Sequence, residues 1–174
     1  ECASVELLSL PGTSADDFVR RSVLLYTGES RLSGSTIAAV RDAYLAGESR
    51  TVTALARIKA LAGEMASALR AGDVDALGRL VGEHWVHQRA LHPSITTPRI
   101  DEIVERAARA GALGVKALGA SGGGCVLAIA AEGREDELAR TIAPLGQRLE
   151  FGIDWDGFQI VAVLDERRDD EHVP

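Results

Sequence analysis

The chain has 174 residues, of which 46% are hydrophobic and 26% are charged, and its formal net charge at pH 7 is -7. This composition is typical of a globular domain, and the acidic balance argues against a nucleic-acid surface, which needs positive charge to displace counterions from phosphates. No apolar run approaches the ~20 residues that span a bilayer and no secretory signal is visible, so we expect no membrane partner. The only cysteines, Cys2 and Cys125, provide no disulfide framework, which favours a cytoplasmic protein.

The first half of the chain predicts two strands and then a series of helices. The segment "SVELLSL", 4–10, alternates partly and ends at Pro11-Gly12, so we expect a strand and a turn there. One helical turn is expected at 14–20, and the β-branched run "SVLLYTG", 22–28, predicts a central strand. Apolar residues at spacings of three and four predict helices at about 35–45, 51–70 and 73–91.

In the second half, Thr97 and Pro98 give a strong helix start, and Gly111 is its expected end. A continuous apolar run predicts a strand at 125–131, and 135–146 predicts a helix that Pro144 ends. Two further strands, 148–154 and 158–166, flank a turn at 155–157. These elements indicate an α+β fold: a ferredoxin-like antiparallel sheet of about four strands, with a helical insertion in the first crossover.

A glycine-rich segment, "KALGASGGGC" at 116–125, lies between the predicted helix that ends near Gly111 and the strand at 125–131. It fits neither G-x-x-x-x-G-K-[ST] nor G-x-G-x-x-G, and its expected order is helix, loop, strand. An anion would therefore meet a nest of loop amides and not the N-terminus of a following helix. Spacing alone favours a packing role, in which the glycines let a helix cross the sheet closely.

The segment "GALGVKALGASGGGCVLAIA", 111–130, resembles the third motif of the GHMP kinases, roughly GA-x-G-x-K-x-x-GAGGGG followed by a hydrophobic strand. Two further stretches resemble the branch that phosphorylates heptose phosphates and related sugars. They are "LLYTGESRLSG", 24–34, and "EHWVHQRALHPSITTPRIDEIVERA", 83–107. The likeness thus covers nearly the whole chain. One letter departs from the motif: Ser121 stands within GASGGG, where it adds a hydroxyl and restricts the backbone.

The resemblance implies a phosphate-binding loop and neighbouring positive charge. The residues expected to line the cofactor side are Gly119, Ser121, Gly122, Gly123 and Gly124. Those expected on the substrate side are Thr27, Arg31 and Lys116. An arginine at a turn can hold a phosphate in a bidentate grip, although an ordinary loop arginine is the alternative. Lys116 could equally be a surface counter-charge to the acidic chain.

The family also has an N-terminal domain, which carries a serine- and glycine-rich ATP loop and the acidic residues for magnesium and for deprotonating the sugar hydroxyl. None of these motifs occurs in the 174 residues. The whole of 1–174 is therefore interpreted as a C-terminal-like domain, with residues 1–12 as a candidate remnant of the first domain and 165–174 as an acidic tail. No catalytic residue is expected in this chain, and ATP and Mg²⁺ are expected to bind mainly through the other half.

The function that follows is the C-terminal part of an ATP-dependent kinase acting on a hydroxyl of a sugar or sugar phosphate. An alternative is a non-catalytic module of the same fold that binds a metabolite or partner. An N-terminal kinase half, in the same or a separate chain, or self-association, is the expected protein partner. Glu83, His84 and His87 could hold a divalent ion, but lack the H-E-x-x-H order, so polar surface residues are the preferred interpretation and no metal site is predicted.

Overall fold

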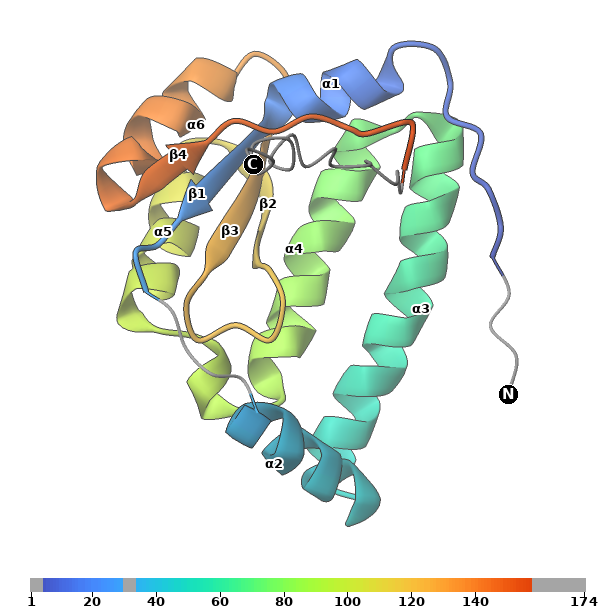
Figure 1. The fold of residues 1–174 in the computed structure, drawn as a ribbon, viewed down its shortest axis with the longest axis vertical. Helices are drawn as coiled ribbons and strands as arrows, with labels where there is room; N and C mark the ends of the chain where they lie inside the picture. The colour runs from blue at the N-terminus through green and yellow to red at the C-terminus, as the bar shows by residue number, and fades with distance from the viewer. Residues whose placement is uncertain (1–4, 30–33, 158–174) are drawn as a thin grey trace, which may run out of the picture.

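The computed structural model describes residues 5–29 and 34–157. Its elements follow the predicted order closely (Figure 1). The helices are α1 Ser14–Arg21, α2 Gly34–Leu45, α3 Ser49–Ala71, α4 Val74–Ala90, α5 Pro98–Arg109 and α6 Glu135–Ile142, with short 3₁₀ turns η1 Pro93–Ile95 and η2 Ala143–Leu145. The strands are β1 Ser22–Tyr26, β2 Ala112–Ala117, β3 Cys125–Ala130 and β4 Gln147–Leu149.

The four strands form one antiparallel sheet in the order β2-β3-β1-β4. The chain connects them as strand, helices, strand, strand, helix, strand, which is the ferredoxin-like arrangement that the sequence predicted. The insertion in the first crossover comprises α2 to α5, and α6 forms the second crossover. In Figure 1 the long antiparallel pair α3 and α4 stands beside the sheet, with β2 nearest to α4.

Three of the strand predictions differ from the structure. The sequence placed no strand at 112–117, where β2 forms the edge of the sheet. Residues 5–10 have no regular structure, and Val5 and Leu7 are 89% and 94% exposed, because no strand pairs with them. The segment predicted as 148–154 is a strand only at Gln147–Leu149, and the strand predicted at 158–166 lies outside the described residues.

Capping residues mark the first or last turn of several helices at the positions that the sequence predicted. Gly72 ends α3 in the left-handed conformation, with φ 67°, and Asp73 accepts a hydrogen bond from Ala76 N at 2.8 Å to cap α4. The Thr97 hydroxyl caps α5 in the same way. Helix α6 is shorter than predicted, because Pro144 cannot donate the next helical hydrogen bond and η2 replaces the final turn.

The sheet has a buried cluster on each face. Alternate β3 residues Val126, Ala128 and Ala130 pack with α5, α6 and the C-terminal part of α4. The other face directs Leu127 and Ile129 towards α1, α3 and the N-terminal part of α4. Strand β3 therefore contributes to both clusters, as the alternation of side chains along a strand requires.

Helix α4 and β2 touch through their backbones. A Cβ atom on Gly114 of β2 would lie 1.9 Å from the Gly78 carbonyl oxygen and 2.6 Å from the Gly82 nitrogen. The two helix glycines are four residues apart and so face the strand together. This contact fixes the position of α4 against the sheet and with it every α4 side chain near the end of β2.

Arg21 joins three elements at the opposite end of the sheet. Its side chain is buried, and its Nε and Nη2 atoms donate to the Ala130 carbonyl oxygen at 3.0 and 2.8 Å. The same guanidinium forms an ion pair with Asp75 in the first turn of α4. The end of α1 is thereby tied to the end of β3 and the start of α4.

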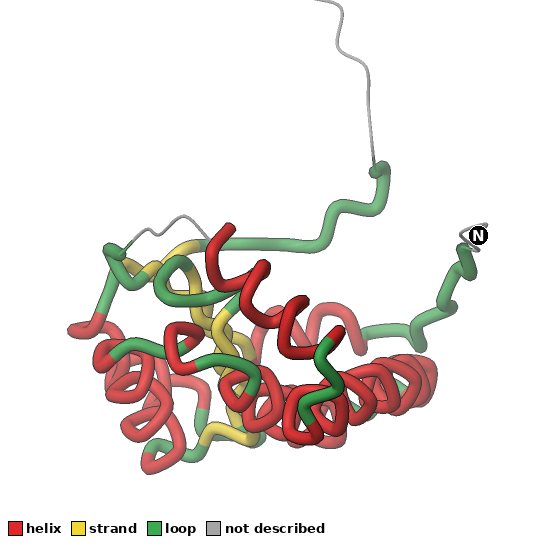
Figure 2. Tube along the Cα trace, turned by 90° about the horizontal axis from the view of Figure 1, so that it is seen from below, coloured by secondary structure: helices red, strands yellow, loops and turns green. Residues whose placement is uncertain are grey.

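After β4 the chain runs along one edge of the molecule, outside the helices (Figure 2). Phe151 in this segment makes an edge-on contact with Phe18 of α1, with ring centroids 6.4 Å apart. The segment ends in a bend in which the Asp154 carboxylate accepts from the backbone nitrogens of Asp156 and Gly157. No helix within the described part of the chain is long and apolar enough to cross a membrane.

Candidate functional site

The glycine-rich segment is the loop of a β-hairpin. It connects β2 to β3, and Leu118 N donates to the Cys125 carbonyl oxygen at 2.8 Å to close it. The predicted order of helix, loop, strand was therefore wrong, because the residues before the loop form β2. Positive φ angles occur at Gly119, Ser121, Gly122, Gly123 and Gly124.

One side of this loop is held by two backbone segments that are distant in sequence. Gly122 N donates to the Ile95 carbonyl oxygen, and Gly124 N donates to the Glu29 carbonyl oxygen, both at 2.8 Å. A Cβ atom on Gly123 would lie 2.8 Å from that Glu29 oxygen, so the close approach requires glycine. The Thr27 hydroxyl donates to the Gly124 carbonyl oxygen at 2.9 Å.

The other side of the loop is held by α4. The Gln88 side chain is buried, and its Nε2 atom donates to the Gly119 carbonyl oxygen and the Ser121 hydroxyl oxygen, each at 2.9 Å. Ser121 has φ 65°, a conformation that costs a non-glycine residue about 1–2 kcal/mol. The hydrogen bond from Gln88 offsets that cost. The serine that departs from the family motif is thus an anchor between the loop and α4.

Several loop amides have no acceptor among the residues that the structure describes. These are the backbone N–H groups of Gly119, Ala120, Ser121 and Gly123. The amides of Gly122 and Gly124 are already bound to protein carbonyls. Gly119, Ser121 and Gly123 among them have positive φ angles. Neighbouring amides without partners in such a loop form the kind of concavity that binds anions.

Lys116 lies at the end of β2, three residues before the first loop glycine, and its side chain is half-buried. Its Nζ atom donates to the neighbouring Ala117 carbonyl oxygen at 3.3 Å. Within residues 5–29 and 34–157, no carboxylate lies within 4.0 Å of it. Partial burial lowers the pKa of Lys116, because removing water disfavours the charged amine. An anion at this position would supply the missing counter-charge.

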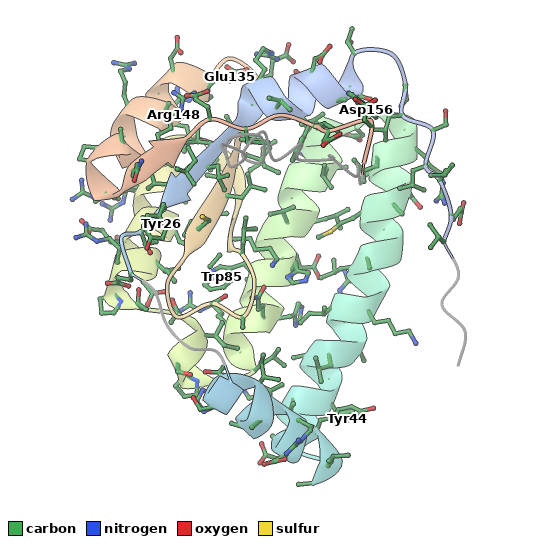
Figure 3. All side chains as sticks on the ribbon, viewed as in Figure 1. Tyr26, Tyr44, Trp85, Glu135, Arg148 and Asp156 are labelled. Carbon is green, nitrogen blue, oxygen red and sulfur yellow. The ribbon has the colours of Figure 1, made fainter. Side chains whose placement is uncertain are left out.

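His84 of α4 is a second group, beside Lys116, that can carry positive charge. Its ring is half-buried, and its Nδ1 atom is buried without a hydrogen-bond partner in the described part of the chain. Burial lowers the pKa of His84, and the positive charge of Lys116 lowers it further. In Figure 3 the next residue, Trp85, lies between α4 and the hairpin loop, where it is 2% exposed.

The arrangement does not form a metal site among the described residues. No group of three or more potential His, Cys, Asp or Glu ligands occurs there. The Glu83 carboxylate is bound by Arg57 at 2.7 Å and lies 3.8 Å from His87 Nε2, and the hydrogen bond from Arg57 lowers the pKa of Glu83. Glu83 is thus engaged by an ion pair on the helix surface.

The structure brings most of the sequence-predicted site residues together. Gly119, Ser121, Gly122, Gly123, Gly124 and Lys116 share the hairpin β2–β3. Thr27 is buried under the loop, where it holds Gly124, and its role in substrate binding stays a prediction. Arg31 lies outside the described residues. Sequence reasoning missed Gln88, although its position seven residues after Val81 on α4 places it on the sheet-facing side.

Comparisons with known proteins agree with this geometry. Residues 65–144, which include α4, α5, β2, the loop, β3 and α6, match the family described as GHMP kinases C terminal. This part of the chain is thus similar to the C-terminal domain of the GHMP kinases. This establishes the family resemblance of the glycine-rich hairpin that the sequence suggested.

The proteins to which this chain is similar include sugar kinases. The L-fucokinase/L-fucose-1-P guanylyltransferase of Bacteroides fragilis is 28% identical over 79% of this chain and 15% of its own length. The crystal structure of L. major mevalonate kinase has a TM-score of 0.65 at 20% identity, over 72% of this chain and 38% of that one. A D-glycero-D-manno-heptose 1-phosphate kinase from Bacteroides thetaiotaomicron has a TM-score of 0.52 at 21% identity, over 83% and 36%. This chain thus spans less than half of each of these proteins, and the structural matches establish the shared fold.

Proposed function

We propose that this chain is the C-terminal part of an ATP-dependent kinase that phosphorylates a hydroxyl of a sugar or sugar phosphate. One observation carries the proposal: Lys116, half-buried and without a neighbouring carboxylate in the described residues, lies beside a loop whose amides lack acceptors. Phosphoryl transfer depends on positioning and on neutralising charge at the phosphate oxygens. A local cation and a rigid nest of amides suit that task, even though the chain as a whole is acidic.

The proposed cofactors are ATP and Mg²⁺. ATP would supply the transferable phosphoryl group, and the amides of Gly119, Ser121 and Gly123 with the Lys116 amine would hold phosphate oxygens. Gly122 and Gly124 would hold the loop in its shape and would not bind phosphate through their amides, because these amides are bound to protein carbonyls. The described residues present no cluster of acids for magnesium. We therefore assign magnesium binding and the base that deprotonates the acceptor to the other kinase half, within the same protein or a partner chain.

A sugar acceptor is supported by the Bacteroides fragilis fucokinase, whose likeness covers most of this chain. The heptose 1-phosphate kinase supports the same class through its fold. We propose a sugar or heptose-phosphate-like acceptor in the cytoplasm, where the free thiol of Cys125 would stay reduced.

The test compares the 174-residue chain with a longer protein that carries it behind an N-terminal kinase domain. Coupled ADP-release assays with Mg-ATP and a panel of sugars and sugar phosphates should show turnover by the longer protein and none by the chain alone. Phosphorylation by the isolated chain above background would show that it contains the catalytic base. Ligand binding without turnover in both proteins would favour the non-catalytic binding module.

The chain offers a matched pair for the same assay, because Lys59 and Lys116 are its only lysines. Lys116→Met in the longer protein should weaken Mg-ATP or sugar-phosphate binding about tenfold, since one charge-assisted contact contributes roughly 1.4 kcal/mol or more. Lys59→Met, on the exposed surface of α3, should leave binding unchanged. Equal effects of the two variants would argue against a specific role for Lys116.

A further inference from the structure

His84 lies on the side of α4 that faces the end of β2. Val81, His84 and Gln88 follow one another at spacings of three and four along this helix face. Val81 belongs to the buried cluster below, and Gln88 holds the glycine-rich loop above. His84 therefore lies between the apolar packing of the sheet and the loop, on a helix that the Gly82–Gly114 contact holds against β2. The positive charge of Lys116, two residues after Gly114 on β2, contributes to the lowered pKa of His84.

The charges around His84 are positive or already paired. From β2 it faces Lys116, and on its own helix His87 adds a second repulsive group. On the neighbouring α3, Arg57 is paired with Glu64 and Glu83. No carboxylate lies within 4.0 Å of the His84 ring among residues 5–29 and 34–157. Lys116 and His84 can both carry positive charge, and no carboxylate among these residues balances them. The Nδ1 atom of His84 also has no hydrogen-bond partner there.

We propose that His84 is a second contact to the phosphate held at Lys116 and the loop, and that it takes up one proton when this phosphate binds. The inference rests on the proposed function and adds a binding residue from α4 to the hairpin. In the free protein partial burial, and then the repulsion from Lys116, lower the pKa of His84 and so favour the neutral imidazole. A bound dianion reverses that balance, so the imidazolium and the ammonium share its charge.

The proposal predicts that anion binding strengthens as pH falls through the range in which histidine titrates. The sign follows from the uptake of a proton: the complex holds one more proton than the free protein, so acid favours the complex. The same chemistry could come from a nucleotide phosphate or from the phosphate of a sugar phosphate. Both sources carry the dianionic oxygen group that Lys116 and His84 would bind.

Inorganic sulfate is the sharpest first probe, because its charge does not change across the range in which His84 titrates. Sulfate affinity of the full chain should be at least about fivefold higher near pH 6 than near pH 8, and the His84 ring resonances should move on binding. His84→Asn should abolish most of this pH dependence, while His87→Asn, one turn further along the same helix, should retain it. Circular dichroism of each variant confirms that the fold is intact.

Competition then identifies the source of the phosphate in the protein that carries the complete kinase. Displacement of sulfate by Mg-AMP-PNP would assign the subsite to the nucleotide, and displacement by a hexose phosphate alone would assign it to the acceptor. An unmoved His84 resonance, or equal sulfate affinity of His84→Asn and the parent chain at both pH values, would overturn the proposal. If either of these outcomes were found in a protein that still phosphorylates a sugar normally, the kinase proposal would be unaffected. Proton-linked sulfate binding without phosphorylation of any sugar would support the subsite and contradict the kinase.

Discussion

At the scale of single residues, the contact between Gly114 and α4 leaves no room for a Cβ atom. The space for a Cβ atom is filled by helix backbone, at 1.9 Å from the Gly78 oxygen, and backbone cannot move aside as a flexible side chain can. Any larger residue must push α4 away from β2. Such a shift would also displace His84 and Gln88 from Lys116 and the loop.

Gly114→Ala is therefore expected to lower the free energy of unfolding by about 3 kcal/mol, as severe overpacking does. The control is Gly63→Ala in α3, where an added Cβ atom meets nothing within 4 Å. That variant should be stabilised by about 0.5–1 kcal/mol, because alanine loses less backbone entropy in a helix than glycine does. Urea denaturation of both proteins measures the two values, and a neutral Gly114→Ala variant would contradict the contact.

At the scale of secondary-structure elements, helices were predictable from apolar spacing and caps, and β2 was not. The segment "ALGVKA" contains a glycine and a lysine and lacks the β-branched run that marks β1 and β3. Its Gly114 allows α4 to pack closely against β2. This tertiary contact requires a glycine, and the glycine weakens the local sequence signal for a strand. The pair Gly78 and Gly82, four apart within a predicted helix, was the available sign of a close backbone approach.

The links between elements can be tested at Arg21, which ties α1 to β3 and α4. Arg21→Met removes two hydrogen bonds to Ala130 and the ion pair with Asp75, and should lower the free energy of unfolding by about 2 kcal/mol. Arg79→Met removes a more exposed contact with the same Asp75, 3.7 Å long, and should cost only about 0.3 kcal/mol. Thermal and chemical denaturation distinguish the two, and similar losses would show that Arg21 acts only as a surface charge.

At the scale of the whole molecule, the two apolar clusters are joined through β3, which supplies residues to each. Loss of packing on one face should therefore expose the other, and the described domain should unfold in one cooperative step. The chain has two tryptophans, and they differ in burial: Trp85 is 2% exposed and Trp155 is 71% exposed.

Trp155→Phe leaves Trp85 as the single fluorescent reporter of the packing between α4 and the loop. Its emission change and the far-ultraviolet circular dichroism should follow one urea transition with a common midpoint, since both report the same unfolding event. The parent chain serves as the control for the effect of the substitution on the midpoint. Two separated midpoints would show that the α3–α4 pair unfolds independently of the sheet.

The candidate site was predictable in part at this scale. The glycines and Lys116 are adjacent in the sequence, so a local motif could identify them together. Gln88 reaches the loop only because α4 crosses β2 at three glycines, and the spacing of residues along the sequence does not reveal this crossing. The sequence-based ferredoxin-like topology was right, although one of its strands was assigned to the wrong segment.

The loop is fastened by Gln88 from α4, Ile95 from η1 and Glu29 beyond β1, and each of these points is distant from the loop along the chain. Each fastening requires a long-range loop of chain to have closed, so the shape of the amide nest forms late in folding. A phosphate compound would bind the folding transition state only weakly, because the amide nest is not yet formed in that state. It would accordingly slow unfolding while leaving the folding rate nearly unchanged, and act as a kinetic stabiliser of the domain.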